Sequence, residues 1–225
     1  MKIESAKKSA GERALEFVEE GMLVGLGTGS TASYFIEALG KKIQEGFSIK
    51  AIATSEKSVS LAKQWNIPLL NYQEVSYLDL TVDGADEIDP NLNMIKGGGG
   101  ALLREKITAV MSKRYIIIVD STKCVETLGS FPLPLEIIPY GYKNTIERLN
   151  DLGYNGTLRK NEAKTFVTDG GHYIYDLHNI ETISNPSSLH FELKGVVGVV
   201  ETGLFFNLAD KAIVGYENGQ SKILG

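Results

Sequence analysis

The sequence predicts an α/β fold, in which a Rossmann-like domain with a parallel sheet is joined to a smaller ferredoxin-like α+β domain. Strand and helix patterns alternate through the first 130 residues, as in a parallel sheet covered by helices. Residues 115–119 (YIIIV) form a nearly continuous apolar run, which is typical of a strand buried on both faces. Beyond residues 131–134 (FPLP) the order of elements changes to β-α-β-β-α-β, the ferredoxin-like arrangement.

The first domain is predicted to begin with a helix whose apolar stripe includes Ala6, Ala10 and Ala14 and which ends at Gly21. Apolar periodicity and helix-breaking residues then indicate alternating strands and helices. The expected elements are a strand at 22–26, a helix around 32–43, a strand at 49–54, a helix at 55–65, a strand at 78–82, a helix around 102–110 and a strand at 115–119.

The second domain follows the FPLP segment. Its expected elements are a strand at 135–139, a helix at 142–152, an extended stretch at 156–168, a strand at 172–176, a helix at 187–193 and a strand at 196–202. Asp169-Gly170-Gly171 is a hairpin signal within this series. A last strand at 211–216 is expected to return to the first sheet. We therefore predict one domain of residues 1–130 plus 205–225 and a second of residues 131–204.

Composition limits the possible functions. The 225 residues are 43% hydrophobic and 23% charged, the profile of a soluble globular protein of one or two domains. A net charge of -5 without a long basic run argues against nucleic acid as the main partner. No apolar run is long enough to span a bilayer, and the N-terminus lacks the apolar core of a signal peptide. Cys124 is the only cysteine, so no internal disulfide can form, and we expect a cytoplasmic protein.

Residues 27–31 (GTGST) join a predicted strand to a predicted helix. The N–H groups at a helix start and the helix dipole favour an anion, and Thr28, Ser30 and Thr31 can add hydroxyl donors. An equally good alternative is a tight turn in which Ser30 or Thr31 caps the helix. A dinucleotide fingerprint would need a third glycine where Ser30 or Ala32 stands, and the lysine of a P-loop is absent. A small phosphorylated ligand is therefore a better candidate than a nucleotide.

The stretch 83–106 (DGADEIDPNLNMIKGGGGALLREK) concentrates the candidate catalytic groups. Asp83 stands where a predicted strand ends, and Glu105 falls in the first turns of a predicted helix. Ligands bind at that edge of open α/β sheets. Glycine is costly to order, so a flexible loop does not account for four glycines in a row between Lys96 and Glu105. We interpret the run 97–100 as backbone that a ligand approaches closely, with N–H groups free to form an anion-binding nest.

These groups suit the abstraction of a proton next to a carbonyl. A carboxylate base takes a carbon-bound proton, while the developing enediolate oxygen needs preorganised donors, which Lys96 and backbone N–H groups can supply. One carboxylate can move the proton between adjacent carbons on one face of the substrate. The stretch therefore predicts the interconversion of an aldose and a ketose.

Several motifs resemble ribose-5-phosphate isomerase, type A. They are GLGTGSTA at 25–32, DGADEI at 83–88, KGGGGALLREK at 96–106, Lys123, and GVVETGLF at 198–205. The resemblance implies interconversion of ribose 5-phosphate and ribulose 5-phosphate through an enediolate, without a metal or other cofactor, with Glu105 as the general base. It also implies a homodimer or a dimer of dimers. The implied substrate contacts are Thr28, Gly29, Ser30, Thr31, Asp83, Gly84, Ala85, Asp86, Lys96, Gly97, Gly98, Gly99 and Lys123, with Asp83, Asp86 and Lys96 also in catalytic roles.

Two other functions are alternatives to this one. A non-catalytic sugar-phosphate sensor would be fused to a DNA-binding module, but the chain has no basic helix-turn-helix segment and little room for one. A metal-dependent isomerase or phosphatase could use Asp83, Asp86, Glu87 and Asp89. Mg²⁺ is usually also held by substrate phosphate, and here the phosphate has a predicted site of its own. The three histidines lie outside this stretch and lack metal-ligand spacing.

Overall fold

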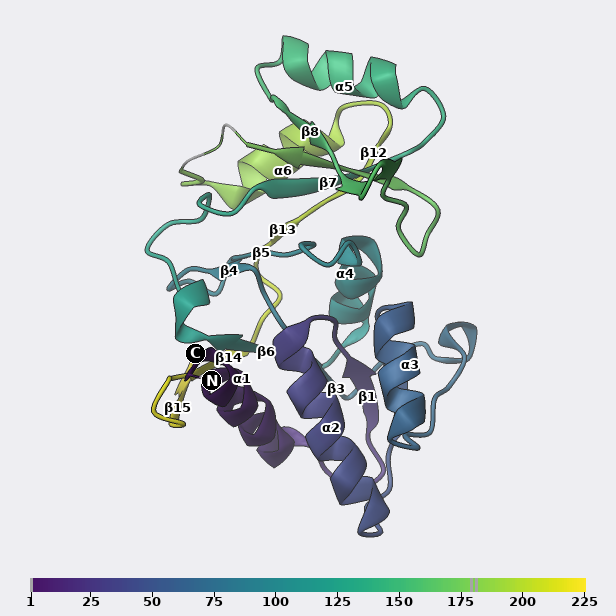
Figure 1. Cartoon of the computed structure of the whole chain (residues 1–225), viewed down its shortest axis with the longest axis vertical. Helices are drawn as coiled ribbons and strands as arrows, with labels where there is room; N and C mark the ends of the chain where they lie inside the picture. Colours follow the sequence, from purple (N-terminus) through teal and green to yellow (C-terminus); the bar gives the residue numbers. More distant parts are fainter. Residues whose placement is uncertain (1, 179, 181) are drawn as a thin grey trace. The chain divides into compact units, whose positions relative to one another are not determined.

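A computed structural model describes residues 2–178, 180 and 182–225, and it divides the chain into two units (Figure 1). The first unit contains Met1–Ala85, Arg104–Cys124 and Leu208–Gly225. The second unit contains Asp86–Leu103 and Val125–Asn207. The chain therefore passes from one unit to the other twice within the glycine-rich stretch, after Ala85 and after Leu103.

A six-stranded sheet forms the centre of the first unit, in the order β15-β14-β6-β3-β1-β2. Its strands are β1 (Leu23–Leu26), β2 (Lys50–Ala53), β3 (Leu80–Asp83), β6 (Tyr115–Asp120), β14 (Lys211–Gly215) and β15 (Ser221–Leu224). The first five are parallel, which confirms the predicted parallel sheet and the return of the last predicted strand to it. The edge strand β15 pairs antiparallel with β14 and was not predicted from the sequence.

Helices cover both faces of this sheet. They are α1 (Lys2–Arg13), α2 (Ser30–Gln44), α3 (Glu56–Gln64) and α4 (Leu102–Met111). Leu80 and Val82 of β3 join the core cluster that contains Phe35 of α2. Thr81 faces the other way, because side chains alternate along a strand, and it accepts a hydrogen bond from Ser112 Oγ at 2.7 Å, just after α4. Figure 1 shows α1 and α2 side by side in this unit.

The first helix ends earlier than predicted. After Arg13 the chain tightens into the 3₁₀-helix η1 (Ala14–Phe17) and becomes extended at Val18. Ala6, Ala10 and Ala14 are buried, as their spacing predicts. Gly21 lies in a turn with φ +80° beyond the helix. An apolar stripe continues equally well through α-helical and 3₁₀ backbone over one turn, which is why the pattern does not locate this change.

The second unit contains a four-stranded antiparallel sheet in the order β12-β7-β11-β8. Its elements along the chain are β7 (Leu133–Ile137), α5 (Tyr142–Asp151), β8 (Gly156–Leu158), β11 (Tyr173–Leu177), α6 (Pro186–Lys194) and β12 (Val199–Thr202). This is the predicted β-α-β-β-α-β arrangement. The predicted extended stretch 156–168 is interrupted by a small hairpin of β9 (Lys160–Asn161) and β10 (Lys164–Thr165). Leu149 of α5 and Leu193 of α6 belong to the core cluster of this unit.

A separate three-stranded sheet in the second unit holds part of the glycine-rich stretch. It has the order β13-β5-β4, from β4 (Glu87–Ile88), β5 (Met94–Ile95) and β13 (Leu204–Phe205). All pairs in it are antiparallel. Each strand is only two residues long, so no hydrophobic alternation marks it in the sequence.

Candidate active site

The loop after β1 lies where the winding of the parallel sheet reverses. The parallel strands β2 and β3 lie on opposite sides of β1, and such a switch point is where α/β sheets bind ligands at the carboxyl ends of strands. The loop also approaches Asp83 closely, because a Cβ on Gly27 would lie 2.2 Å from Asp83 Oδ1. Only glycine fits at this position, so close packing against Asp83 explains why residue 27 is a glycine.

Helix α2 begins without a side-chain cap. Its N-cap is Gly29, with φ +114° and no side-chain hydrogen bond, so the alternative in which Ser30 or Thr31 caps the helix is wrong. Ser30 is exposed, whereas Thr31 is buried. The first turn carries no acidic residue. The N-terminus of α2 can therefore face an anion with its backbone N–H groups and the positive end of the helix dipole.

The Thr28 hydroxyl has a structural role that the sequence did not predict. Thr28 Oγ1 lies 2.7 Å from Thr54 Oγ1 and 2.8 Å from Ser55 Oγ, in a buried group of hydroxyls. Ser58 Oγ in turn donates to the Gly27 carbonyl at 2.7 Å. This network ties the loop after β1 to the start of α3, so the Thr28 side chain holds the loop in place while Ser30 faces solvent.

Lys7 is a candidate site residue that sequence reasoning missed. Its Nζ donates to Ser30 Oγ at 2.8 Å, which places a cation beside the N-terminus of α2. Lys7 lies on α1, which packs along α2. A partly exposed lysine on an amphipathic helix carries no local signal, because only the packing of the two helices brings it to the loop.

Asp83 is a buried carboxylate held at both oxygens. Its Oδ1 accepts the N–H groups of Thr28 at 3.0 Å and Gly84 at 2.8 Å. Its Oδ2 accepts the hydroxyl of Tyr115 at 3.3 Å. Asp83 and Tyr115 share a face of the sheet because β3 and β6 pair with Thr81 opposite Tyr115. The orientation of the Asp83 carboxylate is therefore fixed by groups from three segments.

Glu105 is buried, with 4% of its surface exposed, in the first turn of α4, where the sequence predicted it. The pKa of the Tyr115 hydroxyl is raised well above its usual value by burial and then by the charges of Asp83 and Glu105. Both carboxylates are therefore close enough to the Tyr115 phenol to act on it electrostatically. Tyr115 is thus the neutral hydroxyl of a buried acidic cluster.

Lys123 occupies the edge of the sheet predicted for it. It lies in the short 3₁₀-helix η3 (Ser121–Lys123) directly after β6, and it is half-buried. Thr122 Oγ1 donates to Oδ1 of Asp120, the last residue of β6, and the Thr122 N–H bonds the same oxygen at 3.1 Å. These contacts fix the turn that carries Lys123.

The second unit holds Lys96 in a buried position, with 2% of its surface exposed. Lys96 directly follows β5, and its N–H donates to the Gly203 carbonyl at 2.8 Å. Its ammonium lies 5.4 Å from the centroid of the Phe205 ring, within the range of a cation–π contact. The three-stranded sheet therefore fixes the backbone of Lys96, and Phe205 contacts its charged end.

The glycine run is a folded turn rather than an open nest. Gly98 N–H donates to Asp86 Oδ2 at 2.7 Å, and Gly100 N–H donates to the Gly97 carbonyl at 2.9 Å. The prediction that the run leaves its N–H groups free is therefore wrong at Gly98 and Gly100. Gly97 and Gly100 have positive φ, and a Cβ on Gly98 would lie 2.5 Å from Asp86 Oδ1. The glycines are needed for the turn and for the close approach of Asp86.

The predicted site residues fall into two groups, one in each unit. The first unit brings together the loop after β1, Asp83, Glu105 and Lys123 at the carboxyl edge of one sheet, with Gly84 and Ala85 following Asp83. The second unit brings together Asp86, Lys96 and the glycine run, in which Gly98 and Gly99 are exposed. Within the described residues, no group of three or more His, Cys, Asp or Glu side chains is arranged to hold a metal ion.

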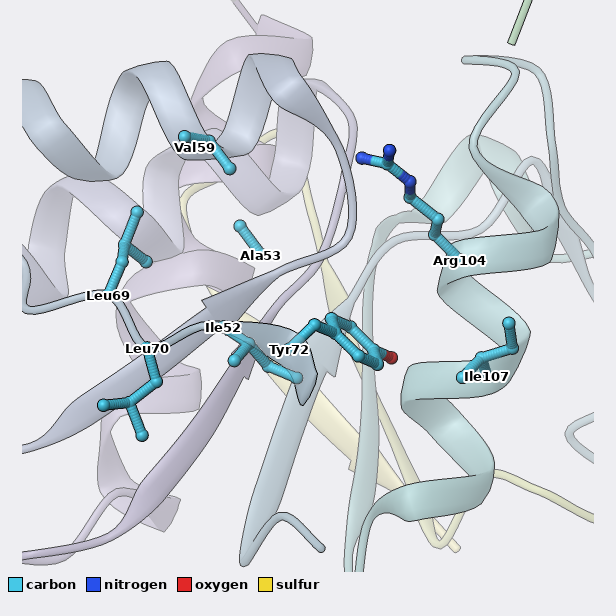
Figure 2. A pocket seen from close by; sticks show the side chains of 8 residues that line it. All are labelled: Ile52, Ala53, Val59, Leu69, Leu70, Tyr72, Arg104 and Ile107. Carbon is cyan, nitrogen blue, oxygen red and sulfur yellow. The ribbon is translucent and has the colours of Figure 1, made fainter. Parts of the chain in front are cut away.

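A pocket of about 370 Å³ lies beside α4 in the first unit (Figure 2). It is lined by Ile52, Ala53, Val59, Leu69, Leu70, Tyr72, Arg104 and Ile107. Figure 2 shows Arg104 reaching from α4 towards the side of the pocket that carries Val59, with Ile107 on the same helix. The Tyr72 hydroxyl lies 2.6 Å from Thr108 Oγ1, and burial raises the pKa of Tyr72. The pocket is largely apolar, and one of its walls is α4, the helix that also carries Glu105.

The fold and these groups define an α/β protein with an uncapped helix N-terminus and buried carboxylates at one edge of a parallel sheet. The profile of the ribose 5-phosphate isomerase A (phosphoriboisomerase A) family matches residues 50–219. The chain belongs to this family. Among the described residues, no helix is long and apolar enough to cross a membrane.

Relatives and solved structures agree with this assignment. The chain is 52% identical to ribose-5-phosphate isomerase A of Protochlamydia amoebophila over 97% of this chain and 95% of that protein. It is 53% identical to the Bacillus mycoides protein of the same name, over 95% and 96% of the two chains. The structure of ribose 5-phosphate isomerase from Plasmodium falciparum is similar with a TM-score of 0.94 and 36% identity, over 99% and 98% of the chains. A D-ribose-5-phosphate isomerase in complex with phospho-erythronic acid is similar with a TM-score of 0.94 and 41% identity, over 100% and 99%.

Proposed function

We propose that the chain is an aldose–ketose isomerase that interconverts D-ribose 5-phosphate and D-ribulose 5-phosphate through an enediolate. The observation that carries this proposal is the buried pair of carboxylates, Asp83 and Glu105, around Tyr115 at the edge of the sheet that also carries the anion-binding loop. The Protochlamydia amoebophila and Bacillus mycoides proteins, both named ribose-5-phosphate isomerase A, match nearly the whole chain. One similar solved structure is a complex with phospho-erythronic acid.

The phosphate is proposed to bind at the N-terminus of α2. The uncapped N–H groups there, the hydroxyl of Ser30 and the ammonium groups of Lys7 and Lys123 supply donors and positive charge. Thr28, Gly29 and Thr31 complete the loop, with Thr28 held by the hydroxyl network. This arrangement supports a ligand with one phosphate group.

Glu105 is proposed as the general base that acts on the open-chain aldose. Its carboxylate takes the proton from C2, and the electron pair of that bond forms the C1–C2 double bond while O1 takes the negative charge. Glu105 then returns the proton to C1. At the same time O2 loses its hydroxyl proton and becomes the ketone oxygen, while O1 gains a proton and becomes a hydroxyl. The net change moves one proton from C2 to C1 and one from O2 to O1, without an oxidant or a cofactor.

Charge develops on O1 and O2 during this transfer, so preorganised donors near these atoms lower the barrier. We assign this role to the buried ammonium of Lys96 and to the backbone of the glycine run 97–99. Asp83 and Asp86, with the Gly84 and Ala85 backbone between them, are proposed to bind the sugar hydroxyls. A sensor without catalysis would have no use for a buried base such as Glu105, so the isomerase is the better account.

Ketose formation from ribose 5-phosphate tests the function directly. We expect the purified protein to convert ribose 5-phosphate into ribulose 5-phosphate, followed by ketose absorbance or by NMR of C1 and C2. The same sample should catalyse the reverse reaction. Conversion no faster than in a protein-free blank would refute the proposal and would favour a sugar-phosphate sensor.

The chain is also proposed to work in the cytoplasm as a homodimer or a dimer of dimers. The assembly proposal rests on the resemblance of the sequence to its family. The cytoplasm proposal rests on the single cysteine, since an exposed, free Cys124 fits a reducing compartment. Light scattering at micromolar concentration should give at least twice the monomer mass of 24.5 kDa. A monomeric mass would refute the assembly proposal and would leave the isomerase proposal intact.

A further inference from the structure

Arg159 connects the antiparallel sheet of the second unit to the glycine run. It lies between β8 and β9, and 16% of its side chain is exposed. Its Nε and Nη2 donate to the two carboxylate oxygens of Asp176 on β11, at 2.8 Å and 2.5 Å. This bidentate pairing fixes the plane of the guanidinium, because both parallel N–H groups are engaged by one carboxylate.

The remaining nitrogen of Arg159 contacts the glycine run directly. Nη1 donates to the carbonyl of Gly97 at 2.8 Å and to the carbonyl of Gly98 at 3.1 Å. Phe166 supports the same contact, since its N–H bonds the Arg159 carbonyl at 2.9 Å and its ring centroid lies 5.8 Å from the guanidinium carbon. A Cβ on Gly100 would lie 2.5 Å from the Phe166 ring, so the run packs closely against this residue.

The two hydrogen bonds from Arg159 also set the directions of the N–H groups of Gly98 and Gly99. In a planar trans peptide the C=O and N–H groups point in opposite directions. When Arg159 holds the Gly97 carbonyl, the N–H of Gly98 points away from it and bonds Asp86 Oδ2 at 2.7 Å. When Arg159 holds the Gly98 carbonyl, the N–H of Gly99 likewise points away from it. Gly99 is exposed, so its N–H is accessible to a ligand.

We propose that Arg159, held by Asp176, is a positioning residue for the isomerase reaction. It orients the Asp86 carboxylate through the Gly98 N–H and presents the Gly99 N–H to an oxygen of the substrate. This inference rests on the proposed function, because the oriented groups are those assigned to the sugar hydroxyls and the enediolate. Arg159 does not contact the substrate in this account and acts only through the turn.

The conservative variant Arg159→Lys gives the sharpest test. Lysine keeps the positive charge, but its single nitrogen cannot replace the planar fork that reaches Asp176 and two carbonyls together. A loose turn misplaces Asp86 and the Gly99 N–H, and small misplacements of reacting groups cost up to about 10²-fold in rate. We expect kcat to fall by about 10- to 100-fold. Competitive inhibition by inorganic phosphate should stay within about twofold of wild type, because the phosphate site lies in the first unit.

Amide hydrogen exchange at Gly98, measured by NMR, supplies a readout that does not depend on turnover. We expect faster exchange at Gly98 in Arg159→Lys, and a smaller change in the same direction in Asp176→Asn. The matched control is Arg148→Lys, which alters a guanidinium whose Nε bonds Asn144, one turn away in α5, at 2.9 Å. It should change neither kcat nor the exchange at Gly98.

The two measurements together decide the outcome. A slower kcat with faster Gly98 exchange and unchanged phosphate inhibition supports the proposal. An unchanged kcat, or a slower kcat without faster exchange, overturns it, and so does a parallel loss of phosphate inhibition. If Arg159→Lys does not fold, Asp176→Asn carries the same test. A wild-type protein that makes no ketose contradicts the proposed function, while Gly98 exchange still tests whether Arg159 fixes the turn.

Discussion

The Tyr115 hydroxyl donates a 3.3 Å hydrogen bond to Asp83 Oδ2 inside the first unit, where the two residues are 1% and 0% exposed. The other carboxylate oxygen accepts two backbone N–H groups, from Thr28 and Gly84. Burial and the neighbouring negative charges raise the pKa of Tyr115, so its hydroxyl stays protonated and remains a donor at neutral pH. Tyr115 therefore fixes the orientation of a carboxylate that we assign to substrate binding.

Tyr115→Phe removes this donor and keeps the ring. We expect kcat to fall about tenfold, or about 1.4 kcal/mol in transition-state free energy, because Asp83 loses the hydrogen bond to its Oδ2 from Tyr115. Steady-state kinetics measures the effect. Tyr175→Phe is a matched control, since Tyr175 is also buried and its hydroxyl bonds Asn150 at 3.0 Å in the second unit. Equal losses in the two variants would show that the Tyr115–Asp83 bond has no specific role.

The phosphate site gives a prediction about affinity. Replacing Ser30, Lys7 or Lys123 by Ala should raise KM for ribose 5-phosphate, with a smaller effect on kcat. A lost charge-assisted contact costs about 1.5–3 kcal/mol, so each lysine variant should lose roughly 10- to 150-fold in affinity. Lys41→Ala is the control, because Lys41 pairs with Glu37 at 2.7 Å near the other end of α2. If KM stays at the wild-type value in all three variants, the phosphate binds elsewhere.

The stability of the first unit should depend on acid through Asp79. Its pKa is lowered by the Leu23 N–H and then by Lys113, whose Nζ donates to it at 2.9 Å. A lowered pKa in the folded state stabilises the protein above the unfolded value of about 3.9, and this stability is lost as the pH falls through the folded value. Asp79→Asn should therefore lose less stability than wild type when the pH is lowered from about 5 to about 2. Urea unfolding at a series of pH values measures the free energy of unfolding of both proteins. Identical losses would contradict the assignment.

Metal removal separates the proposed mechanism from the metal-dependent alternative. The proton transfer assigned to Glu105 and Lys96 uses no metal, so activity should survive exhaustive EDTA treatment and dialysis. The assay is ketose formation before and after treatment. Loss of activity that added magnesium restores would instead support a carboxylate-bound metal at Asp83, Asp86, Glu87 and Asp89.

The parallel sheet and the position of Asp83 at a strand end could be predicted, because strand alternation and glycine-rich turns are local signals. Glu105 followed from the same logic, since it lies one turn into a helix that begins after the glycine run. The sheet that holds Lys96 could not be predicted, because its strands are two residues long and β5 pairs with β13, more than a hundred residues away.

Contacts between distant segments account for the other differences. Lys7 reaches Ser30 through the packing of α1 on α2. Arg159 contacts the glycine run although about 60 residues of chain separate them. Sequence periodicity does not encode such long-range contacts. The glycine run suggested free N–H groups because glycine permits many conformations. In the structure two of these N–H groups bond Asp86 and Gly97, so the glycines serve a tight turn as well as a close approach.

Glu105→Gln tests the central claim that Glu105 moves the proton between C2 and C1. The amide keeps the size of the side chain and removes the base, so kcat should fall by about 10²- to 10⁴-fold while KM changes little. Glu56→Gln is the control, because Glu56 pairs with Arg104 at 3.1 Å and has no proposed role in the chemistry. The most direct measurement is the exchange of the C2 proton of ribose 5-phosphate with solvent deuterium, followed by NMR. We predict that wild type and Glu56→Gln exchange this proton and that Glu105→Gln does not; exchange by Glu105→Gln at near the wild-type rate would contradict the mechanism and make Asp83 the next candidate for the base.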